Sequence, residues 1–566
     1  MRDIVKQSQQ VFLLFLLTIL AFFLRFLGQP TIPYGFHRDE AGILYSAYSI
    51  VETGRDEWGR FMPLHFKALG DYPPGIYNYL VALTIPIVGL VPLAERLPAI
   101  IFGSLLVPLS FLFINSIFKN KKIALLSAFL ITISPWDIVQ SRAGSEALVA
   151  LVFSILGMWC FYLAIKHSRP KLIIITLISY FLALYSYNAA RVGLPLLHGM
   201  LVWYLWPDLK QKQFRRQLML IITLFIFSIA SVFATPGRQM SFQNTSIFTH
   251  PNLSSVSEIA FIRESSLRVP AVVSRVFSNK PVNIIYEFID NYFSYFSFGF
   301  LFNDAGFHKR YLVPRSGPLL VILLPFIILG LSKYSELKRR EKLLLIGWIL
   351  LAPIAAAVTE EATPNVKRSM YLFFPLLILA AAGFIGTIKL LKSQPQSIYY
   401  KKYLPNIVIC TTLLVLGWNF AFFTKQYVIH TKYETVHHRS YGYFEVFAKT
   451  EALEDQYERV YVYENVDTPH LYYLITQQFP PQQYQQIPTE QKRDLFMTEK
   501  PNVNIDQYTF VPHTCPLPEE IREKALYVLP AGCFNNKKLT AVISEVELVN
   551  STDDMPLFYL AHRSTK

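Results

Sequence analysis

Charge is the scarcest property of this 566-residue sequence. Only 16% of its residues are Asp, Glu, Lys or Arg, whereas soluble domains carry about 25%. Hydrophobic residues make up 52%, and the mean hydropathy is positive at +0.32. The apolar residues form blocks of roughly 17–22 residues, long enough to cross about 30 Å of hydrocarbon. These properties exclude an ordinary soluble domain and predict an integral membrane protein.

Cysteine is rare too, and its four positions include no CxxC pair for zinc. Cys160 and Cys410 fall in apolar blocks, where we expect them to pack. Cys515 and Cys533 lie in a polar region and could pair outside a reducing cytosol, which the sequence leaves open. The net charge of +14 does not indicate a nucleic-acid partner, because the Lys and Arg lie in short loops between apolar blocks.

The basic residues predict how the chain crosses the membrane. With the N-terminus inside, eleven spans make every inner loop basic, as the positive-inside rule requires. Counting residues 79–93 as a further span would invert this pattern, so we expect them to lie in the outer interface. The first block lacks a cleavage site and is typical of a retained span. The predicted spans are residues 11–28, 97–117, 122–135, 147–165, 172–187, 192–206, 217–234, 317–332, 343–358, 369–388 and 404–423.

In this topology the C-terminus lies outside, together with three long segments, residues 29–96, 235–316 and 424–566. We expect a polytopic α-helical membrane domain over residues 1–423 and a small extracytoplasmic α/β domain over residues 424–566. Strand-like and helical patterns in the last segment support this division. The expected strands are residues 459–463, 525–529 and 539–543, and the expected helix is residues 469–477.

The notable carboxylates gather on the predicted outer side, although they played no part in assigning the spans. Acidic residues at a membrane boundary carry a desolvation cost and are seldom idle. We therefore predict a plasma (inner) membrane protein whose active site faces the outside or periplasm. The residues are Asp39, Glu40, Asp71, Glu146, Glu360 and Glu361.

Asp39 and Glu40, which follow the first span in the sequence, are the strongest candidates for catalytic residues. A partly desolvated carboxylate here can take a proton from a hydroxyl or amine as general base. Its oxygens could equally bind a divalent cation. The simpler structural interpretation is that Asp39 caps the N-terminus of a helix that follows.

Two more carboxylates have a suggestive setting. Asp71 lies in the sequence GDYPPG, whose prolines and glycines fix a non-helical backbone; an ordinary turn is the alternative. Arg142 and Glu146 are four residues apart, which predicts one helical face at the outer mouth of a span. A plain ion pair would explain that spacing as well.

Three cations are exceptions in a chain that otherwise keeps its cations inside: Arg191, Lys367 and Arg368. A phosphate at the outer leaflet would need such groups. Arginines that extend to lipid headgroups are the alternative.

Together these motifs resemble a bacterial family of membrane glycosyltransferases in the GT-C superfamily. Its neighbours are the protein O-mannosyltransferases and the aminoarabinose transferases that modify lipid A. The resemblance implies a sugar donor on polyprenyl or dolichyl phosphate, a protein, lipid or glycan acceptor, and a single inverting displacement at the outer face. The motifs are HRDEAG at 37–42, TGRDEWGR at 53–60, GDYPP at 70–74, ERLP at 95–98, SPW at 134–136, Arg142, Glu146 and TPNVKR at 363–368.

The same resemblance implies roles for individual residues. Asp39 matches the first-loop acid taken as catalytic base, with Glu40 beside it, and further acids of the site are Asp71 and Glu146. Relatives commonly have a lysine before the paired prolines, where this chain has Tyr72, so Lys67 or an arginine would have to substitute. The phosphate candidates are then Arg142, Arg191, Lys367, Arg368 and Lys67.

Other functions fit the sequence less well. A transporter or flippase of lipid-linked sugars would place ionisable residues within the spans, near the membrane midplane, but the predicted spans are nearly free of acids. A membrane scaffold leaves the clustered acids unexplained, and a ligase that transfers a whole glycan is an alternative within the enzyme class. A divalent metal could assist but is not required.

Overall fold

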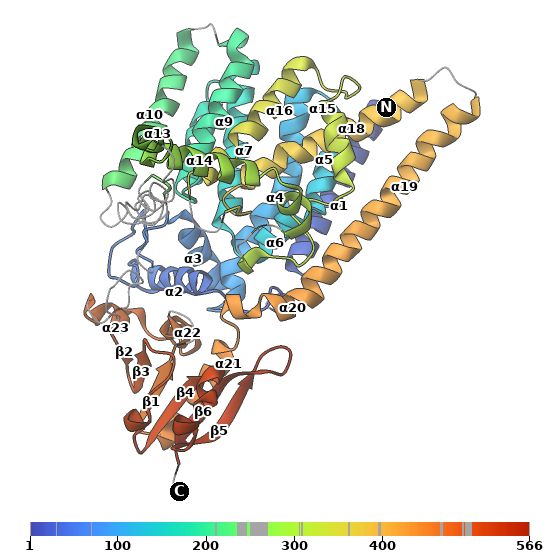
Figure 1. Cartoon of the computed structure of the whole chain (residues 1–566). Helices are drawn as coiled ribbons and strands as arrows, with labels where there is room; N and C mark the ends of the chain where they lie inside the picture. The colour runs from blue at the N-terminus through green and yellow to red at the C-terminus, as the bar shows by residue number, and fades with distance from the viewer. Residues whose placement is uncertain are drawn as a thin grey trace. The chain divides into compact units, whose positions relative to one another are not determined.

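The computed structural model describes residues 2–29, 31–68, 71–209, 212–234, 246–248, 270–304, 306, 309–359, 363–393, 398–464, 468–489, 492 and 501–564. Glu360, Glu361 and part of the predicted outer segment 235–316 lie outside the described residues. The chain divides into two compact units (Figure 1). Unit 1 comprises Met1–Leu27 and Ala99–Tyr427, and unit 2 comprises Gly28–Pro98 and Val428–Lys566. The first predicted outer segment thus belongs to the same unit as the C-terminal segment, while the division of the chain at residue 423 stays a prediction.

Unit 1 is helical, and each of the eleven predicted spans falls on one or two of its helices. Helices satisfy their own backbone hydrogen bonds, which is what hydrocarbon surroundings demand. The helices are α1 (Arg2–Phe26), α4 (Pro92–Phe118), α5 (Lys121–Thr132), α6 (Pro135–Arg142), α7 (Glu146–Lys166), α8 (Leu172–Leu184), α9 (Ala190–Leu205), α10 (Lys212–Ala234), α13 (Ala271–Phe277), α14 (Lys280–Ser294), α15 (Leu323–Leu331), α16 (Arg339–Leu351), α17 (Ile354–Ala357), α18 (Met370–Ser393) and α19 (Ile398–Lys425).

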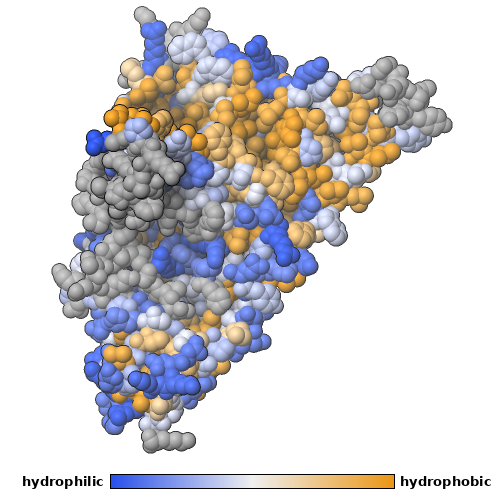
Figure 2. Space-filling view, in the orientation of Figure 1, coloured by the Kyte–Doolittle hydropathy of each residue, from blue (hydrophilic) through white to orange (hydrophobic). Residues whose placement is uncertain are grey.

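Among the described residues, five helices are long and apolar enough to cross a membrane: α1, α4, α7, α18 and α19. A sixth span results if α5 and α6, bent by 48° where Pro135 begins α6, cross together. The surface around α15, α18 and α19 is largely hydrophobic (Figure 2), and Trp418 of α19 is 74% exposed. The chain is therefore a multi-pass membrane protein, whereas the number eleven and the inside–outside orientation stay predictions.

Unit 2 contains one six-stranded sheet in the order β2-β3-β1-β4-β6-β5. The central strand β1 (Arg459–Tyr463) runs parallel to both its neighbours, β3 (Tyr508–Val511) and β4 (Ala525–Pro530), whereas the other three strand pairs of the sheet are antiparallel. The predicted α/β character of the C-terminal segment is thus confirmed. The remaining elements are β2 (Val503–Ile505), β5 (Ile543–Asn550), β6 (Pro556–Arg563), α2 (Arg38–Thr53), α3 (Ile76–Val88), α20 (Thr431–Glu434), α21 (Tyr443–Glu451), α22 (Pro469–Thr476), α23 (Pro481–Gln486) and α24 (Lys537–Thr540).

Most of the expected elements of this segment are present, and one is wrong. The strands expected at 459–463 and 525–529 are β1 and β4, and the expected helix is α22. The strand expected at 539–543 is instead the end of α24 followed by the start of β5. The side chain of Asn536 accepts hydrogen bonds from the backbone N–H groups of Lys538 and Leu539, and such a cap starts a helical turn.

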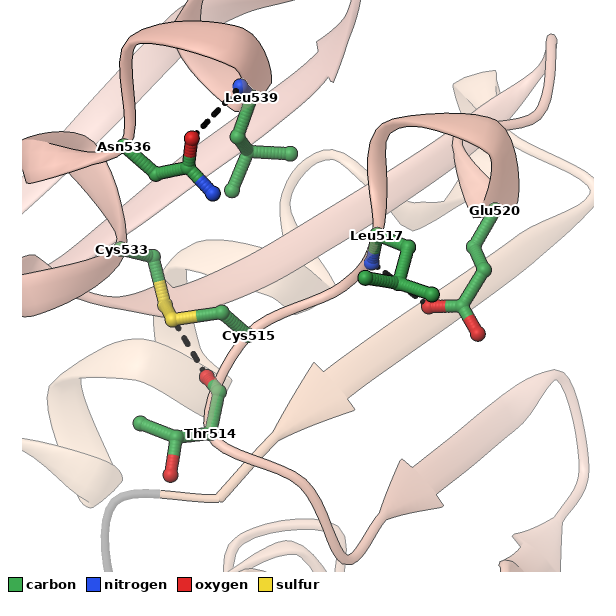
Figure 3. Close-up of a disulfide and its surroundings, with 7 residues drawn as sticks. All are labelled: Thr514, Cys515, Leu517, Glu520, Cys533, Asn536 and Leu539. Carbon is green, nitrogen blue, oxygen red and sulfur yellow. Dashed lines mark hydrogen bonds between the residues drawn. A yellow bond between two sulfur atoms is a disulfide. The ribbon is translucent and has the colours of Figure 1, made fainter.

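Cys515 and Cys533 form a disulfide (Figure 3), which answers the question that the sequence left open. The bond links the segment after β3 to the segment after β4. Cys533 is fully buried and packs in a core cluster with Leu529 and Leu539. Closing a loop of 18 residues restricts the unfolded chain and contributes on the order of 3 kcal/mol.

This pairing makes a prediction about thiol counts. Denatured, non-reduced protein should react with two equivalents of iodoacetamide, at Cys160 and Cys410, which are the free cysteines. After reduction it should react with four, because Cys515 and Cys533 then become thiols. Intact mass measures both counts, and four modified thiols before reduction would contradict the assignment.

Candidate functional site

Asp39 and Glu40 start helix α2 and have different surroundings. The N-cap is His37, whose Nδ1 accepts a hydrogen bond from the Asp39 backbone N–H at 3.2 Å. The expectation that Asp39 is itself the cap is therefore wrong, and Asp39 lies in the first turn. Successive side chains on a helix diverge by about 100°. Asp39 is 49% exposed and its carboxylate lies 3.5 Å from His37 Nδ1, whereas Glu40 is fully buried.

Two buried arginines hold the Glu40 carboxylate. Arg96 Nη2 lies 3.2 Å from one carboxylate oxygen, and Arg439 Nη2 lies 2.6 Å from the other. Both guanidinium groups are almost completely inaccessible to solvent. Removing one member of such a group would leave a buried charge uncompensated, at a cost of about 3–5 kcal/mol. This geometry favours an anchoring role for Glu40 over the predicted catalytic one.

The charged side chains of the loop that follows α2 mostly bind other groups of the same loop. Asp56 is fully buried and accepts hydrogen bonds from the backbone N–H groups of Trp58 and Arg60. The other Asp56 carboxylate oxygen accepts from Arg60 Nε at 2.8 Å. Lys67, a predicted phosphate ligand, places its Nζ 3.9 Å from the centre of the Trp58 ring. These charges primarily hold the loop in its shape.

Glu57, in the same loop, is in contact with Lys492. The hydroxyl of Ser46 donates to Glu57 Oε2 at 2.6 Å, and Lys492 Nζ donates to the Glu57 backbone carbonyl at 3.0 Å. Burial, with the charge of Asp56 adding to it, raises the pKa of Glu57 from 4.5 to about 7. Burial likewise lowers the pKa of Lys492 from 10.5 to about 8.

Asp71 lies at the tip of a tight hairpin, as the prolines and glycines predict. Its backbone exchanges two hydrogen bonds with Ala68, both 2.9 Å, and its Oδ1 accepts the Tyr72 N–H at 2.6 Å. A Cβ atom on Gly75 would lie 2.5 Å from the Phe66 ring, so the packing of this ring against the loop leaves no room for a larger residue.

Tyr72, where the resemblance implies a lysine, has a cation beside its ring. The guanidinium of Arg60 lies 5.4 Å from the centre of the Tyr72 ring. Arg60 also pairs with the buried Asp56 carboxylate, and the substitution of Lys67 or an arginine for the missing lysine stays a prediction. Lys67 instead lies over Trp58.

Arg142 and Glu146 do not share a helical face, so that expectation is wrong. Arg142 ends α6 and Glu146 begins α7, because Gly144, with φ of +60°, breaks the helix between them. The guanidinium of Arg142 donates to the backbone carbonyls of Leu24, Arg25 and Leu27 at 2.7–3.1 Å. Arg142 thus caps the C-terminus of α1.

Glu146 belongs to a cluster of cations and tyrosines in unit 1. Its carboxylate lies 2.6 Å from Lys367 Nζ, with both side chains mostly buried. The same ammonium group lies 5.6 Å from the Tyr187 ring and 6.0 Å from the Tyr311 ring. Arg310 is buried and close enough to repel the charge of Lys367. Cations held against aromatic rings in this way can bind an anion.

The other predicted cations of unit 1 have contacts of their own. Arg368 Nη1 donates to Thr359 Oγ1 at 2.9 Å. Arg191 is buried, donates to Asn188 Oδ1 at 3.4 Å, and lies 5.3 Å from the Tyr185 ring.

Three residues that take part in these buried charged contacts were not predicted from the sequence. Arg310 follows Lys309 in a predicted outer segment, the same signal that identified Lys367 and Arg368. Asp137 forms a fully buried ion pair with Arg25 at 2.9 Å and also accepts from the Ser141 hydroxyl. Arg439 lies 399 residues from its partner Glu40, and no local pattern could have revealed that contact.

No group of three His, Cys, Asp or Glu side chains in the described part of the chain could hold a metal ion. Asp39 and Glu40, the predicted alternative cation ligands, differ in exposure, and Glu40 is already bound to two arginines. The side chains at the start of α2 therefore do not fit a divalent metal.

One family model matches part of this sequence, and several solved structures superpose on this chain. Residues 71–234 match the family model described as dolichyl-phosphate-mannose-protein mannosyltransferase. The structure of ArnT from Cupriavidus metallidurans, bound to undecaprenyl phosphate, superposes with a TM-score of 0.50 at 12% identity and covers 98% of this chain and 97% of ArnT. The resemblance to the GT-C glycosyltransferases is confirmed.

Two larger proteins give weaker superpositions. The oligosaccharyltransferase AglB from Archaeoglobus fulgidus, in complex with an inhibitory peptide and a dolichol-phosphate, gives a TM-score of 0.47 at 13% identity, covering 83% of this chain and 64% of AglB. The arabinofuranosyltransferase AftD from Mycobacteria gives 0.44 at 13% identity, covering 99% of this chain and 40% of AftD. This chain thus spans just under two thirds of the length of AglB. No curated protein sequence matches it.

The raised pKa of Glu57 predicts that the stability of unit 2 depends on pH. Because the folded state binds the Glu57 proton up to about pH 7 and the unfolded chain only up to about pH 4.5, the stability of unit 2 should fall as pH rises between those values, by on the order of 3 kcal/mol. Glu57→Gln should remove this fall. Thermal unfolding in detergent at pH 5, 6 and 7 measures it, with the exposed Glu52→Gln as control. An unchanged pH slope in Glu57→Gln would contradict the assignment.

Proposed function

We propose that the protein is an integral membrane glycosyltransferase. It moves a hexosyl or pentosyl unit from a polyprenyl-phosphate or dolichyl-phosphate donor to an acceptor at the outer face of the plasma (inner) membrane. The match of residues 71–234 and the ArnT fold support the class of reaction. The observation that carries the proposal is Asp39, a half-exposed carboxylate in the first turn of a helix whose next residue is immobilised by two arginines.

In unit 2, Asp39 acts as the general base. It accepts the proton of the acceptor hydroxyl or amine while the acceptor atom attacks the anomeric carbon of the donor sugar. The bond between that carbon and the phosphate oxygen breaks, and the polyprenyl phosphate leaves with the bonding electrons. One displacement inverts the anomeric centre. Because the leaving group is already a phosphate, the residues need only orient the reactants, remove one proton and stabilise negative charge.

Separately, and within unit 1 alone, the cluster around Lys367 serves as a binding site for a lipid phosphate. Lys367, Arg310 and Arg368 supply positive charge, and the rings of Tyr187 and Tyr311 lie near the Lys367 ammonium group. Glu146 orients Lys367 through their 2.6 Å ion pair, so its predicted catalytic role becomes one of positioning. Arg142 and Arg191 contribute less to phosphate binding, because Arg142 caps α1 and Arg191 lies over the Tyr185 ring.

The first experiment tests the base. Purified protein in nanodiscs is incubated with radiolabelled polyprenyl-phosphate sugars and a membrane extract. Wild type should transfer label to an acceptor, and Asp39→Asn should transfer it about 10²–10⁴-fold more slowly, because a missing general base costs that much. Glu52→Gln removes an exposed carboxylate from the far end of the same helix and should match wild type.

Two outcomes would contradict this proposal. Undiminished transfer by folded Asp39→Asn protein would remove Asp39 from the role of base. Binding of the lipid phosphate by wild type without any transfer, across donor sugars and acceptor extracts, would favour the alternative of a transporter or flippase of lipid-linked sugars.

A second experiment tests the phosphate cluster separately. Arg310→Gln should weaken the binding of undecaprenyl phosphate by about 10-fold or more, since a charge-assisted hydrogen bond contributes roughly 1.5–3 kcal/mol. Arg315→Gln is the matched control, because Arg315 is exposed and lies five residues further along the chain. Equal affinities for the two variants would exclude Arg310 from the donor site.

A further inference from the structure

The segment that leads into α2 is held by side chains rather than by neighbouring strands. Three consecutive backbone carbonyls, those of residues 34, 35 and 36, accept hydrogen bonds from three different side chains. Arg439 Nε donates to the first at 3.1 Å, Arg96 Nη2 to the second at 2.7 Å, and the Tyr472 hydroxyl to the third at 2.6 Å. Two of these three donors come from the C-terminal segment of unit 2.

The backbone of the C-terminal segment also touches this region directly. Gly35 has a φ of +78°, and a Cβ atom there would lie 2.5 Å from the carbonyl oxygen of Arg439. Only glycine allows both the conformation and the approach. The Arg439 residue therefore contacts the segment with its backbone, with its Nε atom and, through Glu40, with its Nη2 atom.

The other end of α2 is fastened in the same way. Gln485 Nε2 lies within hydrogen-bonding distance of three acceptors: Ser49 Oγ at 3.0 Å, Thr53 Oγ1 at 2.9 Å and the Asp56 carbonyl at 3.0 Å. In the middle of the helix, the Tyr45 hydroxyl donates to the Phe479 carbonyl at 3.0 Å. The C-terminal segment thus contacts α2 near its start, in its middle and near its end, and Arg439 contacts the first turn through its ion pair with Glu40.

We propose that Arg439 is a positioning residue for the base Asp39, and that the C-terminal segment is therefore part of the catalytic apparatus. The inference rests on the proposed function. Glu40 and Asp39 are consecutive in the first turn of α2, so fixing the Glu40 carboxylate fixes the rotation of that turn about the helix axis. The direction of the Asp39 carboxylate follows from that rotation. Misplacing a reacting group by about 1 Å can cost 10²-fold in rate.

The test uses Arg439→Lys in the full-length protein, because lysine keeps the positive charge. A lysine cannot reach both Glu40 and the Tyr34 carbonyl, since it lacks the planar fork of the guanidinium. The matched control is Lys449→Gln. It removes another cation of the C-terminal segment, one that is bound to Leu548, Glu445 and Glu547 rather than to α2.

The first readout needs no substrate. Hydrogen exchange of the α2 amides, including the Ala41 N–H that donates to His37, should become about tenfold faster in Arg439→Lys and stay unchanged in Lys449→Gln. Unchanged exchange in Arg439→Lys would overturn the inference even if the wild-type protein transferred no sugar, a result that would by itself count against the proposed function.

The second readout is a double-mutant cycle on sugar transfer. Arg439→Lys should lower kcat by about 10–100-fold with little change in the KM for the donor. In an Asp39→Asn background the same substitution should add almost nothing, because Arg439 acts through Asp39. If the two effects multiply, or if KM changes in place of kcat, Arg439 has another role and the inference is wrong.

Discussion

The cost of taking a charge out of water governs this structure. The sequence is poor in charge, yet it places several charged side chains in buried positions, and some of these are met by an opposite charge. The pairing connects residues that are far apart in the sequence, so each buried pair also fixes the packing of two elements. The pairs with full or near-full burial are Arg25 with Asp137, Glu40 with Arg96 and Arg439, and Lys367 with Glu146.

This constraint separates two adjacent carboxylates that look equivalent in the sequence. Glu40 faces two guanidiniums and is removed from solvent, while Asp39 remains half-exposed on the same turn. A buried carboxylate between two cations is a poor proton acceptor, since both cations stabilise its charged form. The Asp39 carboxylate next to it lies on the same fixed turn and is half-exposed. Anchoring and chemistry are thus divided between neighbouring residues.

Much of the fold was accessible from the sequence because its signals are local. Apolar blocks predicted the helices of unit 1, and the strand-like patterns predicted β1 and β4. The errors also have local causes: Asn536 starts a helical turn where a strand was expected, and Gly144 separates Arg142 from Glu146. The partners of Glu40 could not be predicted, because Arg439 is 399 residues away and a single sequence contains no record of contacts at that distance.

The division of unit 2 into two stretches of chain has a consequence for biosynthesis. Residues 28–98 emerge from the ribosome early, but the stretch that completes their unit begins only at residue 428, about 330 residues later. At 5–20 residues per second, the first stretch waits roughly 20–60 s for its partner. During that interval the Glu40 carboxylate lacks Arg439, so the early stretch cannot reach its final packing while the membrane helices are being inserted. Maturation of the region around Asp39 is thereby coupled to completion of the chain, and a prematurely terminated protein would retain its membrane helices without a finished α2.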